Sequence, residues 1–172
     1  MEVGPREVGG FTCVWKAFRE KPEAPVALTQ RALAHQETHD NDDAIADLNT
    51  LLSNYPTARE REAALQQKAL LLGQKDDAKG MSDAFRQLLK EFPKSPVAAQ
   101  AQYYIGKAAF EAKDYKAAIP PLDAARKLNK DQFYTPSTVR IISAYFYQKN
   151  RKALTAEIEK FLKPPEYAQT WI

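Results

Sequence analysis

The sequence is poor in the residues that build disulfide frameworks and flexible phosphate loops. It has one cysteine, Cys13, and six glycines among 172 residues. A single cysteine excludes an internal disulfide and a cysteine metal cluster, and it suits a reducing compartment. No apolar run approaches the roughly 18–20 residues of a membrane-spanning helix. The first ten residues, MEVGPREVGG, lack the continuous apolar core of a signal peptide. We therefore expect no direct membrane insertion.

Motifs of catalysis and of nucleic-acid binding are also missing. The sequence contains no Gly-rich phosphate loop, no G-x-S-x-G elbow and no C-x-x-C pair. We therefore predict neither an enzyme nor a bound cofactor. Residues 90–172 are basic, with 14 Lys and Arg against 8 Asp and Glu. These charges form no compact run interleaved with aromatic residues, so a nucleic-acid partner is not expected.

Both histidines lie in one polar stretch, HQETHDNDD, at residues 35–43. The spacing H-x-x-x-H would place two imidazoles on one helix face, as a zinc pair requires. The order H-Q-E-T-H, however, misplaces the glutamate that a zinc protease needs, and the stretch lacks the glycine and closing glutamate of a calcium loop. Carboxylates at a helix start accept hydrogen bonds from free backbone N–H groups. We interpret the stretch as an inter-helix turn in which Asp42 and Asp43 open the second helix, and we predict no metal site.

A 37-residue repeat is the strongest pattern in the chain. Turn-like endings recur at 51–56 (LLSNYP), 88–93 (LLKEFP) and 125–130 (ARKLNK). Small and large apolar residues follow the same step, which predicts two amphipathic helices per unit, packed closely where the small residues stand. The aligned columns are Ala32/Ala69/Gly106, Ala44/Met81/Ala118, Leu48/Phe85/Leu122 and Leu51/Leu88/Ala125.

The last unit follows the pattern less closely. The same step leads from Gly106 to Ser143, so we expect Val139, Ile142 and Phe146 to face inward beside it, and the turn after them to be about two residues shorter. In the third unit, Pro120 and Pro121 predict that the second helix starts late or is kinked.

The third unit, AQYYIGKAAFEAKDYKAAIPPLDAARKL, resembles a tetratricopeptide repeat. The resemblance covers residues 25 to about 162 and implies an all-α fold, a right-handed superhelical array of antiparallel helix pairs. The long period and the stretch FPKSPVAAQAQYYIGKAAF resemble a sub-group of bacterial cell-envelope proteins, which includes the tol-pal cell-division coordinator and outer-membrane assembly lipoproteins. The sub-group implies the periplasm, whereas a native lack of a signal peptide would imply the cytoplasm, so the compartment stays open.

These observations predict the organisation of the chain. We expect a disordered leader at 1–10 and an N-terminal helix at 11–24, either a half repeat or a cap. The array would cover 25–163 as about four helix pairs, and 164–172 would form a C-terminal tail. The predicted pairs are 25–57, 58–94, 95–131 and 132–163.

The resemblance implies a non-catalytic scaffold or adaptor that binds a peptide or partner helix in the groove lined by the first helices, within a bacterial multiprotein assembly. Among the groove positions, Tyr103, Phe110 and Tyr147 would be anchors, with Lys107 and Arg140 facing a carboxylate. Two alternatives stay open, a homo-oligomeric structural array and the repeat region of a larger enzyme or transport complex. The predicted groove residues are Gln66, Leu70, Gln74, Gln100, Tyr103, Lys107, Phe110, Arg140 and Tyr147, and Ala144 is expected on the same face.

Overall fold

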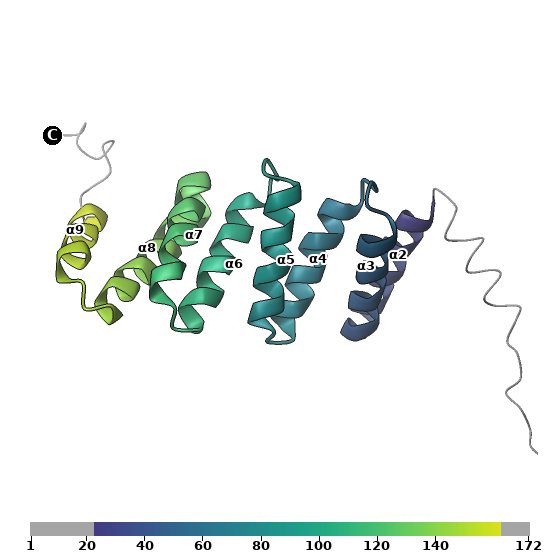
Figure 1. Cartoon of the computed structure of the whole chain (residues 1–172), viewed down its shortest axis with the longest axis horizontal. Coiled ribbons are helices and arrows are strands. Elements are labelled where there is room, and N and C mark those ends of the chain that lie inside the picture. The colour runs from purple at the N-terminus through teal and green to yellow at the C-terminus, as the bar shows by residue number, and fades with distance from the viewer. Residues whose placement is uncertain (1–22, 163–172) are drawn as a thin grey trace, which may run out of the picture. The chain divides into compact units, whose positions relative to one another are not determined.

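The computed structural model describes residues 23–162. The predicted leader and tail, and nearly all of the predicted N-terminal helix, lie outside these residues. Within 23–162 the regular structure is entirely α-helical (Figure 1). The helices are α2 (Ala24–Glu37), α3 (Asn41–Asn54), α4 (Arg61–Gln74), α5 (Ala78–Glu91), α6 (Ala98–Glu111), α7 (Tyr115–Leu128), α8 (Lys130–Tyr147) and α9 (Arg151–Leu162). They belong to two compact units, and the second unit begins at Leu65, inside α4.

In the first unit, α2 and α3 form a helix pair around small buried residues. Ala32 of α2 and Ala44 of α3 have no solvent-exposed surface, and neither have Leu48 and Leu51 further along α3. Alanine at these points lets the two helix backbones approach closely, and the leucines fill the space beside them. The first-unit residues of the predicted columns are therefore buried as expected.

In the second unit, a glycine faces a large residue across two helix pairs, α4–α5 and α6–α7. A Cβ atom on Gly106 would lie 2.6 Å from Leu122 Cγ and 3.1 Å from the backbone oxygen of Ala118, so no larger residue fits there without movement. Met81 departs from the small-residue column, and a Cβ atom on Gly73 would lie 2.8 Å from its sulfur. Met81 therefore occupies the room that Gly73 leaves free.

The turn inside each helix pair follows one design. Two residues after the first helix ends, one residue adopts the left-handed conformation, with φ between 55° and 63°, and an Asp or Asn follows it. The backbone N–H of that next residue donates to a carbonyl five residues back, which closes the helix. These residue pairs are His39–Asp40, Asp76–Asp77, Lys113–Asp114 and Lys149–Asn150.

The positions of these turns correct the expected register of the last pair. Successive turns are 37, 37 and 36 residues apart. The last step is shorter because a single residue, Asn129, precedes α8, whereas residues 92–97 precede α6, and the greater length of α8 (18 residues against 14) makes up all but one residue of that difference. The missing residue lies before the turn, so the expected shorter turn is wrong. Gly106 therefore corresponds to Ile142 rather than to Ser143.

Burial on α8 follows the corrected register. Val139 and Phe146, which we expected to face inward, are 49% and 63% exposed. The buried apolar residues on this part of α8 are Ile141 and Ala144. A slip of one residue rotates a helix face by about 100°, which accounts for the exchange.

The expected late start of the helix that contains Pro120 and Pro121 is also wrong. Helix α7 begins at Tyr115 and includes both prolines as its sixth and seventh residues. Two prolines remove two backbone hydrogen bonds from the helix interior. Packing offsets this cost, because Leu122 on α7 is completely buried next to Ile141 of α8.

A buried arginine joins α7, α8 and α9. Arg126 is 5% exposed, pairs with Asp123 and Glu157, and donates to the hydroxyl of Thr138 at 3.1 Å. Burial alone would lower the pKa of Arg126, but the hydrogen bonds to Glu157 and Asp123 raise it. Burial likewise would raise the pKa of Asp123, but the hydrogen bonds from Lys127 and Arg126 lower it below its usual value.

Candidate functional site

The histidine stretch is an inter-helix turn, as interpreted. Helix α2 ends at Glu37, His39 adopts the left-handed conformation with φ 63°, and α3 begins at Asn41. Asp42 and Asp43 lie in the first turn of α3. Between residues 23 and 162, no group of three or more His, Cys, Asp or Glu side chains is placed to hold a metal ion.

The other histidine lies beside an ion pair between α2 and α3. Asp47 is 6% exposed, and both of its carboxylate oxygens bond to the guanidinium group of Arg31, with Nε to Oδ2 at 2.6 Å. The hydrogen bond to Asp47 raises the pKa of Arg31. His35 Nε2 lies 3.8 Å from Asp47 Oδ2, at the edge of this pair. These contacts hold α2 to α3, and both oxygens of the Asp47 carboxylate are bound by Arg31.

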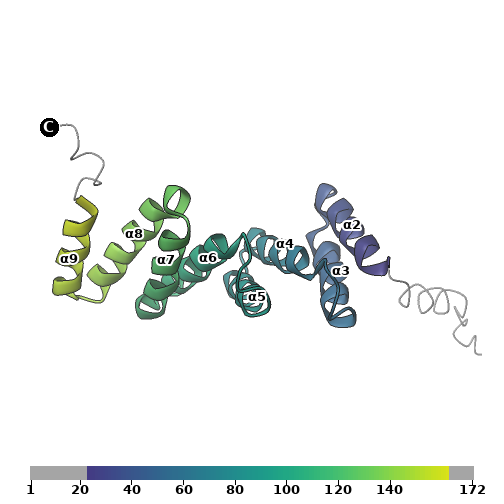
Figure 2. The ribbon, with the colours of Figure 1, turned by 90° about the horizontal axis from the view of Figure 1, so that it is seen from above.

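The nine predicted groove residues all belong to α4, α6 and α8, within the second unit. Helices α6 and α8 contact each other directly. Figure 2 shows α6 following α5, with α7 and α8 next to it. We call the side chains of α4, α6 and α8 that share this surface the first-helix face. It is defined by Gln66, Leu70, Gln74, Gln100, Tyr103, Lys107 and Phe110 with the outward residues of α8.

Polar contacts connect neighbouring helices on the first-helix face. Gln66 Nε2 donates to Gln100 Oε1 at 3.4 Å, which links α4 to α6. The guanidinium carbon of Arg140 lies 5.2 Å from the centre of the Tyr103 ring, a cation–π contact between α8 and α6. Tyr103 also packs on Phe133, with ring centres 5.0 Å apart, so this tyrosine supports the helix packing as well as the surface.

Aromatic rings occupy the other end of the same face. The Phe110 ring lies 5.3 Å from Tyr115 and 6.2 Å from Tyr147. Tyr115 and Tyr147 are stacked, with ring centres 4.9 Å apart and an angle of 18°. The structure therefore brings the predicted anchors Phe110 and Tyr147 together, and Tyr115 of α7, which the sequence analysis did not name, contacts both rings.

A cleft opens between α4 and α6. It has a volume of about 480 Å³, and its lining includes Leu70 and Gln74 of α4 and Lys107 of α6 from the predicted set. Tyr104 lines it too; its ring stacks on the buried Phe85 with centres 5.6 Å apart. Lys107 Nζ lies 3.6 Å from Glu111 on the same helix. The cleft thus combines an apolar side with a polar edge.

Helix α8 is where the predicted set needs correction. Ala144, expected on the binding face, is completely buried. The 36-residue step places Val139 and Phe146 at the positions that Tyr103 and Phe110 occupy on α6, and both are exposed. The sequence reasoning missed these two residues because it kept the 37-residue step. The spacing from Asp114 to Asn150 in the sequence could have revealed them.

Two family models described as tetratricopeptide repeat match the sequence, at residues 26–58 and 69–132. The chain carries tetratricopeptide repeats. Solved structures agree. The chain is 18% identical to a MamA protein, with a TM-score of 0.68, 81% of this chain covered and 72% of that one. At these identities the likeness shows the fold, which is the predicted array of helix pairs. No curated protein matches the sequence.

Two further solved structures have the same fold. YrrB, described as a TPR protein with an unusual peptide-binding site, is 19% identical, with a TM-score of 0.59, 86% of this chain covered and 74% of that one. BtubC from P. vanneervenii is 10% identical, with a TM-score of 0.60, 88% of this chain covered and 72% of that one. Within residues 23–162, no helix is both long and apolar enough to cross a bilayer.

Proposed function

We propose that this chain is a non-catalytic interaction module that binds a peptide or helix of a partner protein along the first-helix face. The cleft between α4 and α6 is the observation that carries the proposal. Its lining combines the apolar surfaces of Leu70 and Tyr104 with the polar groups of Gln74 and Lys107. Binding sites for peptides commonly combine an apolar pocket with a few polar groups that fix the orientation.

Each part of the cleft suits a different part of a peptide. The apolar side accepts an aliphatic or aromatic side chain, whose transfer from water supplies most of the affinity. The exposed amide of Gln74 can both donate to and accept from a peptide backbone. Among residues 23–162, Lys107 forms an ion pair with Glu111, one helical turn away on a partly exposed surface, and such pairs contribute little stability. A partner carboxylate can therefore replace Glu111 at low cost.

The rest of the first-helix face would extend the contact beyond the cleft. The linked amides of Gln66 and Gln100 lie on the α4–α6 side, and the Tyr103–Arg140 contact leads to α8. Aromatic and arginine side chains are the residues most often found at energetically dominant positions of protein interfaces. YrrB, a protein of the same fold, is described as having a peptide-binding site, which supports peptide binding as the kind of function proposed.

We also propose that the module acts in a bacterial multiprotein assembly of the cell envelope. The support is the long repeat period and the join FPKSPVAAQAQYYIGKAAF, which resemble the envelope sub-group. Under this proposal the partner is an envelope protein and the full-length protein lies in the periplasm.

The test is affinity capture from lysate of the source cells with three forms of the full chain. The test variant is Gln74→Ala/Lys107→Glu, which changes the cleft. The matched control is Gln87→Ala/Lys90→Glu, the same changes at exposed positions of α5. We expect a partner retained by the wild type and the control and lost by the test variant. Equal retention by all three would place the binding surface elsewhere.

A further inference from the structure

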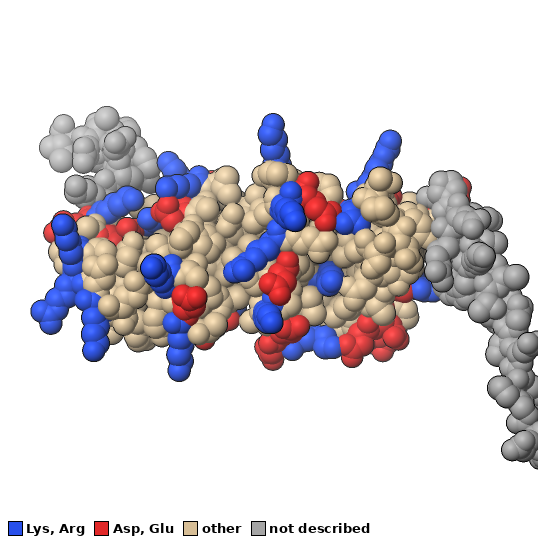
Figure 3. Space-filling model, in the orientation of Figure 1, with Lys and Arg blue, Asp and Glu red and all other residues tan. Residues whose placement is uncertain are grey.

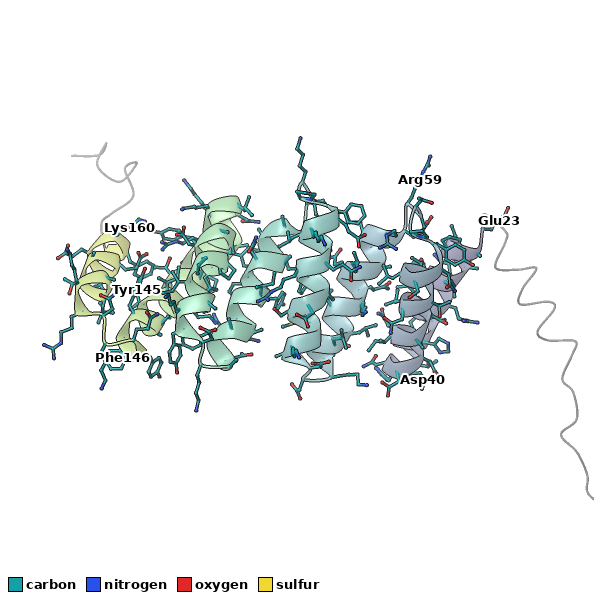
Figure 4. All side chains as sticks on the ribbon, viewed as in Figure 1. Glu23, Asp40, Arg59, Tyr145, Phe146 and Lys160 are labelled. Atoms are coloured by element: carbon teal, nitrogen blue, oxygen red, sulfur yellow. The ribbon has the colours of Figure 1, made fainter. Side chains whose placement is uncertain are left out.

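A second cleft lies where α8 turns into α9. It has a volume of about 540 Å³ and is lined by Tyr145, Phe146, Tyr147, Lys149, Arg151 and Leu154. Figure 4 places Phe146 at the end of α8, next to the turn that leads into α9. We call these six residues the α8–α9 cleft. Only Tyr147 also belongs to the nine predicted groove residues.

Two aromatic rings of the α8–α9 cleft are exposed to solvent, and each is held in place by contact with a neighbouring ring. Tyr147 is 55% exposed and stacks on Tyr115 from α7. Phe146 is 63% exposed, and its ring centre lies 5.6 Å from that of Tyr147. Tyr145 also lines the cleft and packs on the buried cluster of Ala118, Leu122 and Ile141. The cleft therefore presents apolar rings on a rigid support, which keeps the entropy cost of binding low.

The charges around the α8–α9 cleft have one sign. Its lining holds Lys149 and Arg151 and no carboxylate. Within residues 23–162, neither of these two cations has an ion pair or a side-chain hydrogen bond to another described residue. On the face drawn in Figure 3, Lys and Arg side chains project around the α8–α9 end of the second unit.

The other clefts of the second unit differ in this respect. The cleft between α4 and α6 includes Asp76 and Glu111 in its lining. A third cleft, along α5, α6 and α7, is lined by two cations, Lys79 and Arg86, and by five carboxylates, Asp76, Asp77, Asp83, Glu111 and Asp114, so its lining is net acidic. Like charges repel, so a segment with several carboxylates is disfavoured at the cleft along α5, α6 and α7, and at the α4–α6 cleft, where Lys107 is the one cation of the lining, a single carboxylate is accepted but further ones are repelled. A segment with several carboxylates is therefore favoured at the α8–α9 cleft.

We propose that the α8–α9 cleft binds an acidic segment of a partner protein that carries an aromatic or aliphatic anchor. The anchor packs on the exposed faces of Phe146 and Tyr147, and Asp or Glu side chains on either side of it pair with Lys149 and Arg151. Exposed charges at the edge of an interface mainly accelerate association and fix the orientation, and the buried rings hold the complex. The inference does not require that the first-helix face bind anything.

The test measures fluorescence anisotropy of labelled peptides against the full chain. The first probe is a short peptide with a central Leu-Phe pair flanked on both sides by Asp and Glu. The second probe replaces every acidic residue by Lys. We expect the acidic probe to bind about tenfold more tightly than the lysine probe, and its affinity to fall as salt is added.

Variants separate the cleft from the overall charge. Lys149→Glu/Arg151→Glu is expected to weaken the acidic probe about tenfold, and Phe146→Ser about fivefold at unchanged charge. The matched control Lys94→Glu/Lys130→Glu makes the same charge change at two exposed positions and is expected to leave the affinity within about twofold. Circular dichroism melts of each variant verify that the chain is folded.

Several results would overturn the inference. Equal losses in the charge variant and in its control would show attraction to net charge alone. Equal binding of the two probes would remove the charge argument. Binding to phosphatidylserine vesicles, lost in Lys149→Glu/Arg151→Glu while the acidic peptide does not bind, would assign the cleft to a membrane surface instead. Because Lys149 and Arg151 lie after the end of α8, outside the first-helix face, the results with the charge variant and its control leave the proposed function standing.

Discussion

The third helix pair, α6–α7, and the fourth, α8–α9, both lie in the second unit and share one arrangement, but different contacts hold them together. In the third pair, Gly106 of α6 admits the buried Leu122 of α7, and four of the residues on α7 are buried. In the fourth pair, α9 contains no buried residue. Its contact with the preceding helices includes Glu157, which pairs with the buried Arg126. Close apolar packing holds the third pair, and half-buried contacts with one ionic network hold α9.

The difference follows from position in the array. A helix pair with neighbours on both sides buries both helices, whereas α9, among the helices of residues 23–162, packs mainly on α8. The same exposure leaves the α8–α9 cleft open with its rings and cations accessible. The third pair, α6–α7, thus supplies packing stability, and the fourth pair, α8–α9, supplies exposed surface for binding.

The largest expected effect is on the third pair. Leu122→Ala removes a completely buried side chain and is expected to lower the free energy of unfolding by about 2–5 kcal/mol. Ile158→Ala, the comparable change on half-buried α9, is expected to cost about 1 kcal/mol. Urea denaturation followed by circular dichroism measures both. Equal losses would contradict the division between the two pairs.

The next effect concerns the ionic network. Glu157→Gln leaves Arg126, a buried cation, with Asp123 as its remaining carboxylate. We expect α9 to lose about 1–3 kcal/mol of local stability, because a charged hydrogen bond is lost in a buried position. Hydrogen exchange of the α9 amides measures the change. The control Glu159→Gln alters an exposed residue of the same helix and is expected to leave exchange unchanged.

The same network predicts a pH dependence. The folded-state pKa of Asp123 is lowered, so its ionised form stabilises the fold above the ordinary carboxyl pKa, and that contribution is lost as the pH falls through the folded pKa. We expect the stability difference between the wild type and Asp123→Asn to shrink on acidification. Melting curves of both proteins over an acid pH series measure it. A difference that stays constant would remove Asp123 from the account.

The smallest expected effect comes from the turns. Lys113 and Lys149 adopt positive φ, which glycine tolerates without steric cost. Lys113→Gly is expected to stabilise the chain by about 0.5–1 kcal/mol, whereas Lys113→Ala, which removes the charge but keeps the strain, should not. Lys149→Gly should have less effect on global unfolding, because the turn that contains Lys149 connects α8 to α9, which is held by fewer buried contacts. Thermal melts of the three variants are the measurement.

Sequence alone predicted the fold because its signal repeats. Residues 37 apart, such as Leu48, Phe85 and Leu122, are all completely buried, and a single period therefore located the core. It failed on α8, where the loop between pairs shortened to Asn129 and the helix lengthened. A periodic pattern does not show where one residue is missing. The cap residues Asp114 and Asn150 show it, because they are 36 rather than 37 residues apart.

The candidate site was only partly accessible to the same reasoning. Position within the repeat selected residues that contact one another across helix boundaries, Gln66 with Gln100 and Tyr103 with Arg140. It could not reveal the cleft beside Gln74, which depends on side-chain volumes such as that of Met81. The assignment of the nine residues to binding stays a prediction.

One measurement tests the proposed function most directly. A photoreactive benzoylphenylalanine residue replaces Gln74 on the first-helix face or Gln87 on α5, and the chain is irradiated in living source cells. The account predicts a cross-linked partner from position 74 and none from position 87, with the cross-link lost when Lys107→Glu is added. Equal or greater cross-linking from position 87 would contradict it.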